Sequence, residues 1–137
     1  MAAPPRVSDI LSLEPSSPME ERIREGFSPQ SIEALQDFLQ VSQEELASAL
    51  GVTRQTLIRN KRRGKLLSPR LSDQVHRVAR VTRKALQVFD DRESAVGWLK
   101  DDNATLGGRA PLRLLDTDAG VEKVEHLLGR IEWGVYS

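Results

Sequence analysis

The sequence predicts an all-α protein. Apolar residues recur at helical spacing along most of the chain after residue 17, and residues that commonly cap helices precede most of these segments. No stretch shows the alternation of apolar and polar residues that is typical of a strand. With 137 residues, 39% of them apolar and 29% charged, the chain has the composition of a globular protein with one domain or two small ones.

The first elements are an arm and two helices. Residues 1–17 contain Pro-Pro and Ser-Ser pairs and little apolar periodicity, which predicts a flexible arm. Residues 18–27 predict a short helix that ends at Gly26. The pair Ser28-Pro29 predicts the start of the next helix. The apolar face of that helix contains Ile32, Leu35, Phe38 and Leu39.

Three capped helices follow in the middle of the chain. The capping box from Ser42 to Glu45 opens a helix that ends at Gly51. Thr53 caps the next helix, whose apolar residue Leu57 faces inward. Ser68 and a proline then start a longer helix. Its inward positions are Leu71, Val75, Val78, Ala85 and Phe89.

The last third of the chain predicts two more helices with a loop between them. Asp91 caps a helix over residues 92–100, residues 101–108 form a loop, and Pro111 starts one short helical turn. Thr117 caps the last helix, with Val121, Val124, Leu127, Leu128 and Ile131 inward. Gly120 within that helix costs about 1 kcal/mol relative to alanine. We therefore expect another helix or a partner to approach closely there.

Positive charge is concentrated in the middle of the chain. Residues 51–86 contain 11 Lys/Arg and 1 Asp/Glu, residues 1–50 contain 3 and 9, and residues 87–137 contain 6 and 10. A basic block between two acidic segments favours an anionic partner, because residues that only solubilise a surface are usually of mixed sign. A solvated basic helix face is the alternative.

The basic block coincides with the pattern of a helix-turn-helix. Two short helices meet at Gly51, small Ala47 permits close crossing, and the second helix would enter the major groove of DNA. Arginine suits guanine and glutamine suits adenine at its N-terminal end, and the later cations suit phosphates. A structural module whose basic face binds protein or RNA is the alternative. The candidate DNA-binding residues are Thr53, Arg54, Gln55, Thr56, Arg59, Asn60, Lys61, Arg62, Arg63 and Lys65.

Residues 18–137 resemble the Xre/MbcA/ParS antitoxins of bacterial type II toxin-antitoxin systems. The matching stretches are ELASALGVTRQTLIR, GKLLSPRLSDQVHRVARV, VFDDRESAVGWLK, LGGRAPLRLLDTDAG and VEHLLGRIEWGVYS. The resemblance implies an Xre-like helix-turn-helix module followed by a small helical domain that binds a RES-domain toxin. It also implies that the toxin consumes NAD, that the C-terminal region blocks the toxin active site, and that the complex represses its own operon.

The last residues suit an interface, since two of the six aromatic residues lie in the final five positions. Tyr136 is the residue we expect to enter the toxin, and Trp133 is open between core and interface. The segment LGGRAP is equally compatible with a packing corner and with a toxin contact. The candidate toxin-binding residues are Trp98, Leu106, Gly107, Gly108, Arg109, Arg130, Trp133, Gly134, Val135, Tyr136 and Ser137.

These patterns predict a flexible arm over 1–17, a helix-turn-helix module over 18–88 that binds DNA and dimerises, and a toxin-binding domain over 89–137. A homodimer is expected because one helix-turn-helix reads only a half-site. We expect no enzymatic activity, metal or cofactor, because no nucleophile, phosphate-loop or metal-ligand motif is present. The absence of cysteine, membrane span and signal peptide predicts a cytoplasmic protein. A plain transcriptional regulator whose C-terminal helices only dimerise is the alternative function.

Overall fold

The computed structural model describes residues 18–134, and the all-α prediction is confirmed there. The arm over 1–17 and the residues Val135, Tyr136 and Ser137 lie outside this range. The elements are α2 (Met19–Glu25), α3 (Gln30–Leu39), α4 (Gln43–Leu50), α5 (Arg54–Arg62), α6 (Pro69–Phe89), α7 (Arg92–Lys100), the 3-10 turns η1 (Ala104–Leu106) and η2 (Pro111–Leu114), and α8 (Asp118–Glu132). Within residues 18–134 the only β-type pairing is a single bridge between Asn103 and Arg109.

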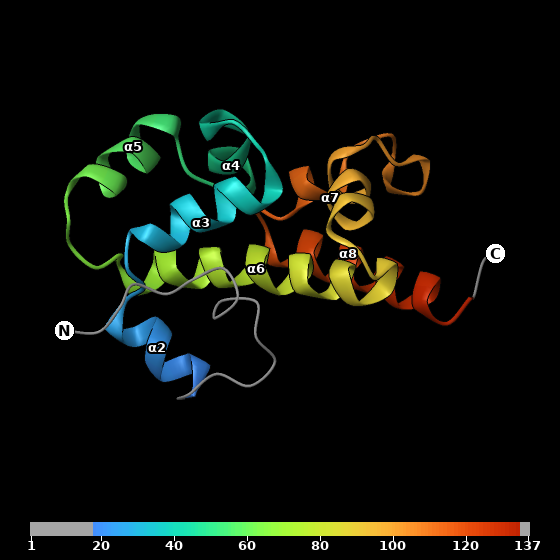
Figure 1. The fold of residues 1–137 in the computed structure, drawn as a ribbon, viewed down its shortest axis with the longest axis horizontal. Coiled ribbons are helices and arrows are strands. Elements are labelled where there is room, and N and C mark those ends of the chain that lie inside the picture. The colour runs from blue at the N-terminus through green and yellow to red at the C-terminus, as the bar shows by residue number, and fades with distance from the viewer. Residues whose placement is uncertain (1–17, 135–137) are drawn as a thin grey trace.

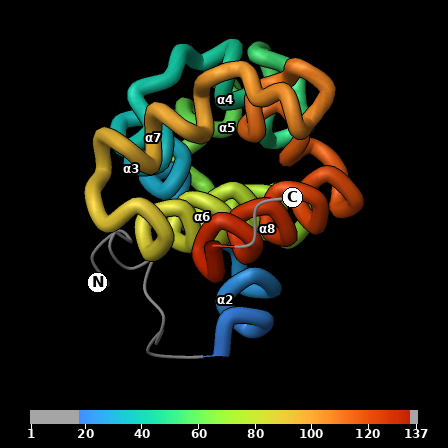
Figure 2. Tube along the Cα trace, turned by 90° about the vertical axis from the view of Figure 1, so that its right-hand side faces the viewer, coloured from blue at the N-terminus to red at the C-terminus, as the bar shows by residue number. Residues whose placement is uncertain are grey.

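Helix α6 is the central helix, against which most of the other helices pack. It runs along the long axis, with α3, α4 and α5 over one half of its length and α7 over the other half, while α8 lies beside it (Figure 1). Helix α2 packs against α6 from the side opposite to α4, α5 and α7 (Figure 2). The central helix therefore connects the predicted DNA-binding half to the predicted toxin-binding half.

Side-chain caps fix the starts of most of these helices. The reciprocal capping box of α4 is confirmed: the Ser42 hydroxyl accepts from the Glu45 backbone N–H at 3.0 Å, and the Glu45 carboxylate accepts from the Ser42 N–H at 3.2 Å. The predicted caps of α5, α6, α7 and α8 are also confirmed, at Thr53, Ser68, Asp91 and Thr117. Hydrogen bonds from Ser94 hold the pKa of Asp91 below its usual range.

Helix α3 starts one residue later than Ser28-Pro29 suggests. Pro29 is the residue before the helix, and the Ser28 hydroxyl accepts a hydrogen bond from the Gln30 backbone N–H at 3.3 Å. The loop predicted over 101–108 also contains the 3-10 turn η1. Both differences concern one turn of backbone, and neither changes the order of the helices.

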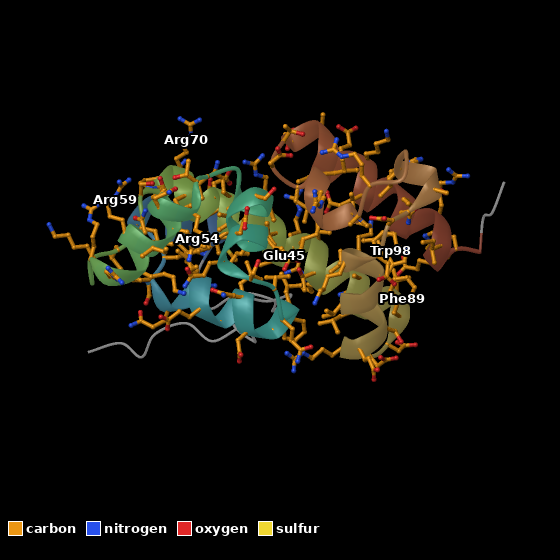
Figure 3. The ribbon with its side chains drawn as sticks, turned by 90° about the horizontal axis from the view of Figure 1, so that it is seen from above. Glu45, Arg54, Arg59, Arg70, Phe89 and Trp98 are labelled. Atoms are coloured by element: carbon orange, nitrogen blue, oxygen red, sulfur yellow. The ribbon has the colours of Figure 1, made fainter. Side chains whose placement is uncertain are left out.

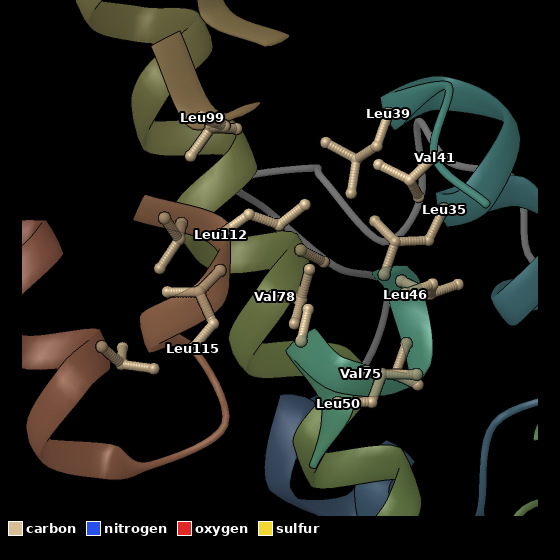
Figure 4. Packing of buried hydrophobic residues seen from close by; sticks show 14 of the residues in the cluster. Leu35, Leu39, Val41, Leu46, Leu50, Val75, Val78, Leu99, Leu112 and Leu115 are labelled. Carbon is tan, nitrogen blue, oxygen red and sulfur yellow. The ribbon is translucent and has the colours of Figure 1, made fainter. Parts of the chain in front are cut away.

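One hydrophobic core runs through both halves of the chain. Side chains of α3, α4, α6, α7 and η2 converge in it (Figure 4). Helix α4 packs against η2 as well as against α5 and α6. The central members are Leu35, Leu39, Leu46, Leu50, Val75, Val78, Leu99, Leu112 and Leu115, all of them buried. The two halves are therefore packed together and not joined by a bare linker.

Polar contacts join the same two halves. The Arg92 guanidinium on α7 donates to the backbone carbonyls of Asp37 and Phe38 at 2.9–3.0 Å and lies 4.9 Å from the centre of the Phe38 ring. The Lys100 ammonium donates to the Gln40 carbonyl at 2.8 Å. Both cations thus sit at the C-terminal end of α3, where helix carbonyls lack intrahelical partners and carry partial negative charge.

The expected close approach at Gly120 is confirmed. A Cβ atom built on Gly120 would lie 1.7 Å from the backbone oxygen of Leu114 and 2.8 Å from its carbonyl carbon. The neighbour is the last residue of the short η2 turn, which packs against α8. Only glycine leaves room for this crossing.

Candidate DNA-binding and toxin-binding surfaces

The predicted helix-turn-helix is present in α4 and α5. Gly51 ends α4 with a φ of +72°, in the left-handed region that glycine tolerates. Ala47 is buried, and its carbonyl accepts a hydrogen bond from the Val52 N–H at 3.0 Å. Leu57 is fully buried on the inner face of α5. Ala47, Gly51 and Leu57 therefore have the positions that the sequence pattern predicted for a helix-turn-helix.

The outer face of α5 is strongly basic. Arg54, Gln55, Arg59, Arg62 and Arg63 are all exposed, and none of their side chains makes a hydrogen bond or ion pair within residues 18–134. Arg54 and Arg59 lie in the same half of the molecule as Arg70 of α6, away from Phe89 and Trp98 (Figure 3). We call Arg54, Gln55, Arg59, Arg62 and Arg63 the basic face of α5.

Four other candidate DNA-binding residues form side-chain hydrogen bonds within the fold. The Asn60 side-chain amide donates to the Thr56 carbonyl at 2.8 Å, and Thr56 itself takes part in the Thr53 cap. The Lys61 ammonium donates to the Gln36 side chain of α3 at 3.2 Å. Lys61 lies four residues after the buried Leu57 and therefore on the same side of α5. It is not part of the basic face of α5. Thr53 and Lys65 are exposed at either end of this region.

The LGGRAP segment combines the two roles that the sequence left open. Leu106 is buried in the core, which favours packing for this residue. Gly107, Gly108 and Arg109 are exposed on a loop whose ends are tied together by the hydrogen bond from the Asn103 N–H to the Arg109 carbonyl, at 3.2 Å. A partner can therefore reach the loop tip but not Leu106.

Trp98 and Trp133 lie in different surroundings. Trp98 is half-buried and its ring centre is 5.7 Å from that of Phe89, so the pair covers the edge of the core. Trp133 follows α8 and is 80% exposed. It borders a shallow hollow of about 600 Å³ together with Lys84, His126 and Arg130. This exposure excludes a core role for Trp133 within residues 18–134.

Two family models match the chain in the order of these surfaces. An antitoxin Xre-like helix-turn-helix domain matches residues 18–80, and the antitoxin Xre/MbcA/ParS C-terminal toxin-binding domain matches residues 84–134. An Antitoxin Xre of Yersinia enterocolitica is 30% identical over 118 residues, which cover 85% of this chain and 80% of that protein. The chain belongs to the Xre antitoxin family. An Antitoxin Xre of Photorhabdus laumondii is 37% identical over 67 residues, or 48% of this chain and 45% of that protein.

The antitoxin has one further surface feature, of which the sequence indicated only Gly108 and Arg109, as candidate toxin-binding residues. A groove of about 830 Å³ opens between α4 and the segment from Lys100 to Arg113. The α4 residues on its wall are Glu44, Glu45 and Ser48. Glu45 belongs to the capping box, and the other two residues belong to no motif of the sequence. They face the toxin-binding domain only because α4 packs on η2.

Residues 18–134 of the antitoxin lack two features of other protein classes. No helix there is both long and apolar enough to cross a membrane. The same residues hold no group of three His, Cys, Asp or Glu side chains that could bind a metal ion. His76 is half-buried on α6, where burial and the positive charge of Arg80 lower its pKa.

Proposed function

We propose that this antitoxin neutralises a RES-domain toxin that consumes NAD, and that it binds operator DNA to repress its own operon from the cytoplasm. The match of residues 84–134 to a toxin-binding domain is the observation that carries the proposal. The resemblance of LGGRAPLRLLDT and RIEWGVYS to antitoxins of RES toxins supplies the class of toxin. The exposed Trp133, two positions before Val135 in the sequence, supports a role of the C-terminal end in blocking the toxin.

The basic face of α5 supports the DNA half of the proposal. Arg54 and Gln55 lie in the first turn of α5, the end of a recognition helix that reads base edges. Arg62 and Arg63 lie at the other end and suit phosphates. A dimer would place two such helices about 34 Å apart, one helical turn of DNA.

A transcriptional regulator without a toxin is the alternative, with Trp133 buried between two copies of the chain. The exposure of Trp133 is compatible with both functions, whereas the match to a toxin-binding domain favours the antitoxin. An adjacent gene for a RES-domain protein would support the antitoxin, and its absence would favour the regulator.

Substitutions in the two halves of α5 are expected to have different effects on DNA binding. Arg54→Ala with Gln55→Ala should reduce the preference for operator over random DNA by about 10-fold or more, because base contacts carry sequence information. Arg62→Ala with Arg63→Ala should weaken binding to operator and to random DNA by the same factor. It should also reduce the slope of log affinity against log salt by about 2. Fluorescence anisotropy at several salt concentrations measures both quantities.

The double variant Arg109→Ala with Arg113→Ala is a control of equal charge, because these arginines lie in the toxin-binding domain. It should leave the operator affinity within about 3-fold of the unchanged protein and the salt slope unaltered, because both arginines lie outside the basic face of α5. An unchanged salt slope in the Arg62/Arg63 variant would contradict the assignment of those residues to phosphates.

A further inference from the structure

The groove between α4 and the segment from Lys100 to Arg113 has two differently charged walls. The exposed Arg109 and Arg113 lie on one wall, and the exposed Glu44 lies on the α4 wall. Asp102 also lines the groove. It is therefore a polar surface formed by one helix of the DNA-binding domain and one loop region of the toxin-binding domain.

Some of the charged groups that line the groove are already used within the fold. Lys100 donates to the Gln40 carbonyl, and the Glu45 carboxylate accepts from the Ser42 N–H. The side chains of Arg109, Arg113 and Glu44, in contrast, make no hydrogen bond or ion pair with any other residue in the range 18–134. The charges that a partner could pair with are thus two guanidinium groups, of Arg109 and Arg113, and two carboxylates, of Glu44 and Asp102.

The backbone that carries the two arginines is held in place. The Gly108 N–H donates to the Asn103 carbonyl at 2.9 Å, and the Arg113 N–H donates to the Ala110 carbonyl at 3.0 Å. Leu112, between them in the chain, is buried in the core. Binding a partner would therefore cost only the ordering of two side chains, and arginine in such a setting is a frequent source of binding energy.

We propose that this groove is part of the toxin interface and takes a toxin segment that presents carboxylates to Arg109 and Arg113. The inference rests on the proposed function, and it extends the toxin interface onto α4 of the helix-turn-helix. Nucleic acid does not fit, because Glu44 and Asp102 would repel phosphates. A protein segment with acidic groups on one side and a basic group facing Glu44 matches the charges of both walls.

Two variants of the full-length antitoxin test the proposal. Arg109→Glu with Arg113→Glu reverses the charge of one wall, and Ser48→Trp fills the groove from the exposed face of α4. The probe is a purified RES-domain toxin, the partner in the proposed function, titrated by calorimetry. We expect the charge reversal to weaken toxin binding about 100-fold and the tryptophan about 10-fold, because both remove contacts inside the groove.

The control is Lys123→Glu, which reverses an exposed charge on α8 outside the groove and should change toxin affinity less than about 3-fold. Operator affinity and the thermal midpoint should be unchanged in all three variants, which excludes misfolding as the cause. Toxin affinities within 3-fold of the unchanged protein for both groove variants would overturn the proposal. So would loss of self-association with toxin binding intact, since the groove would then bind a second copy. Failure of the unchanged antitoxin to bind the toxin would instead refute the proposed function.

Discussion

Replacing Gly120 with alanine is expected to lower the free energy of unfolding by about 2–3 kcal/mol or more. The added methyl group would lie 1.7 Å from the Leu114 carbonyl oxygen, which belongs to the backbone and cannot rotate away. The η2 turn would have to separate from α8. Urea unfolding followed by circular dichroism measures the change.

Gly97→Ala is the matched control for this substitution. Gly97 lies inside α7, and a Cβ built on it would have no neighbouring atom within 4 Å. Alanine there should raise the free energy of unfolding by about 0.5–1 kcal/mol, because it reduces the conformational freedom of the unfolded chain. Equal effects of the two substitutions would show that the close approach of η2 to α8 is wrong.

Removing residues 133–137 is expected to abolish toxin neutralisation. The segment contains Trp133, which is 80% exposed and so adds little to the core, and Tyr136, which we expect to enter the toxin. The free energy of unfolding should therefore change by less than about 0.5 kcal/mol, and operator affinity by less than about 3-fold. Growth of cells that express the toxin, and anisotropy with operator DNA, measure the two activities.

Leu66→Ala is the control for loss of an exposed apolar side chain. Leu66 is 62% exposed but lies between α5 and α6, outside the toxin-binding domain, so neutralisation should persist. If the shortened chain lost operator binding as well, or unfolded at a much lower temperature, residues 133–137 would be part of the fold and not of the toxin interface.

Local signals in the sequence were sufficient to place most helix starts. Thr53, Ser68, Asp91 and Thr117 each accept a backbone hydrogen bond at the predicted position, because a cap depends only on residues within one turn of it. The prediction of which side chains of each helix are buried was less accurate. Phe38 and Phe89 are half-buried, because each lies near the end of its helix.

Contacts between segments far apart in the chain could not be predicted from the sequence. Arg92 binds carbonyls 54 and 55 positions earlier in the chain, and Lys61 binds Gln36. No periodicity encodes such pairs, because they depend on how α7 and α5 pack against α3. The sequence indicated Gly108 and Arg109 but not the α4 wall of the groove, since its walls come from two segments that meet only in the fold.

The rate of NAD consumption by a RES-domain toxin measures directly whether this antitoxin blocks the toxin. The toxin is mixed with increasing amounts of the full-length antitoxin, and the remaining NAD is measured over time. We expect consumption to stop once the antitoxin is in molar excess, and to proceed at the uninhibited rate with the chain that lacks residues 133–137. Unchanged NAD consumption in the presence of excess full-length antitoxin would contradict this expectation.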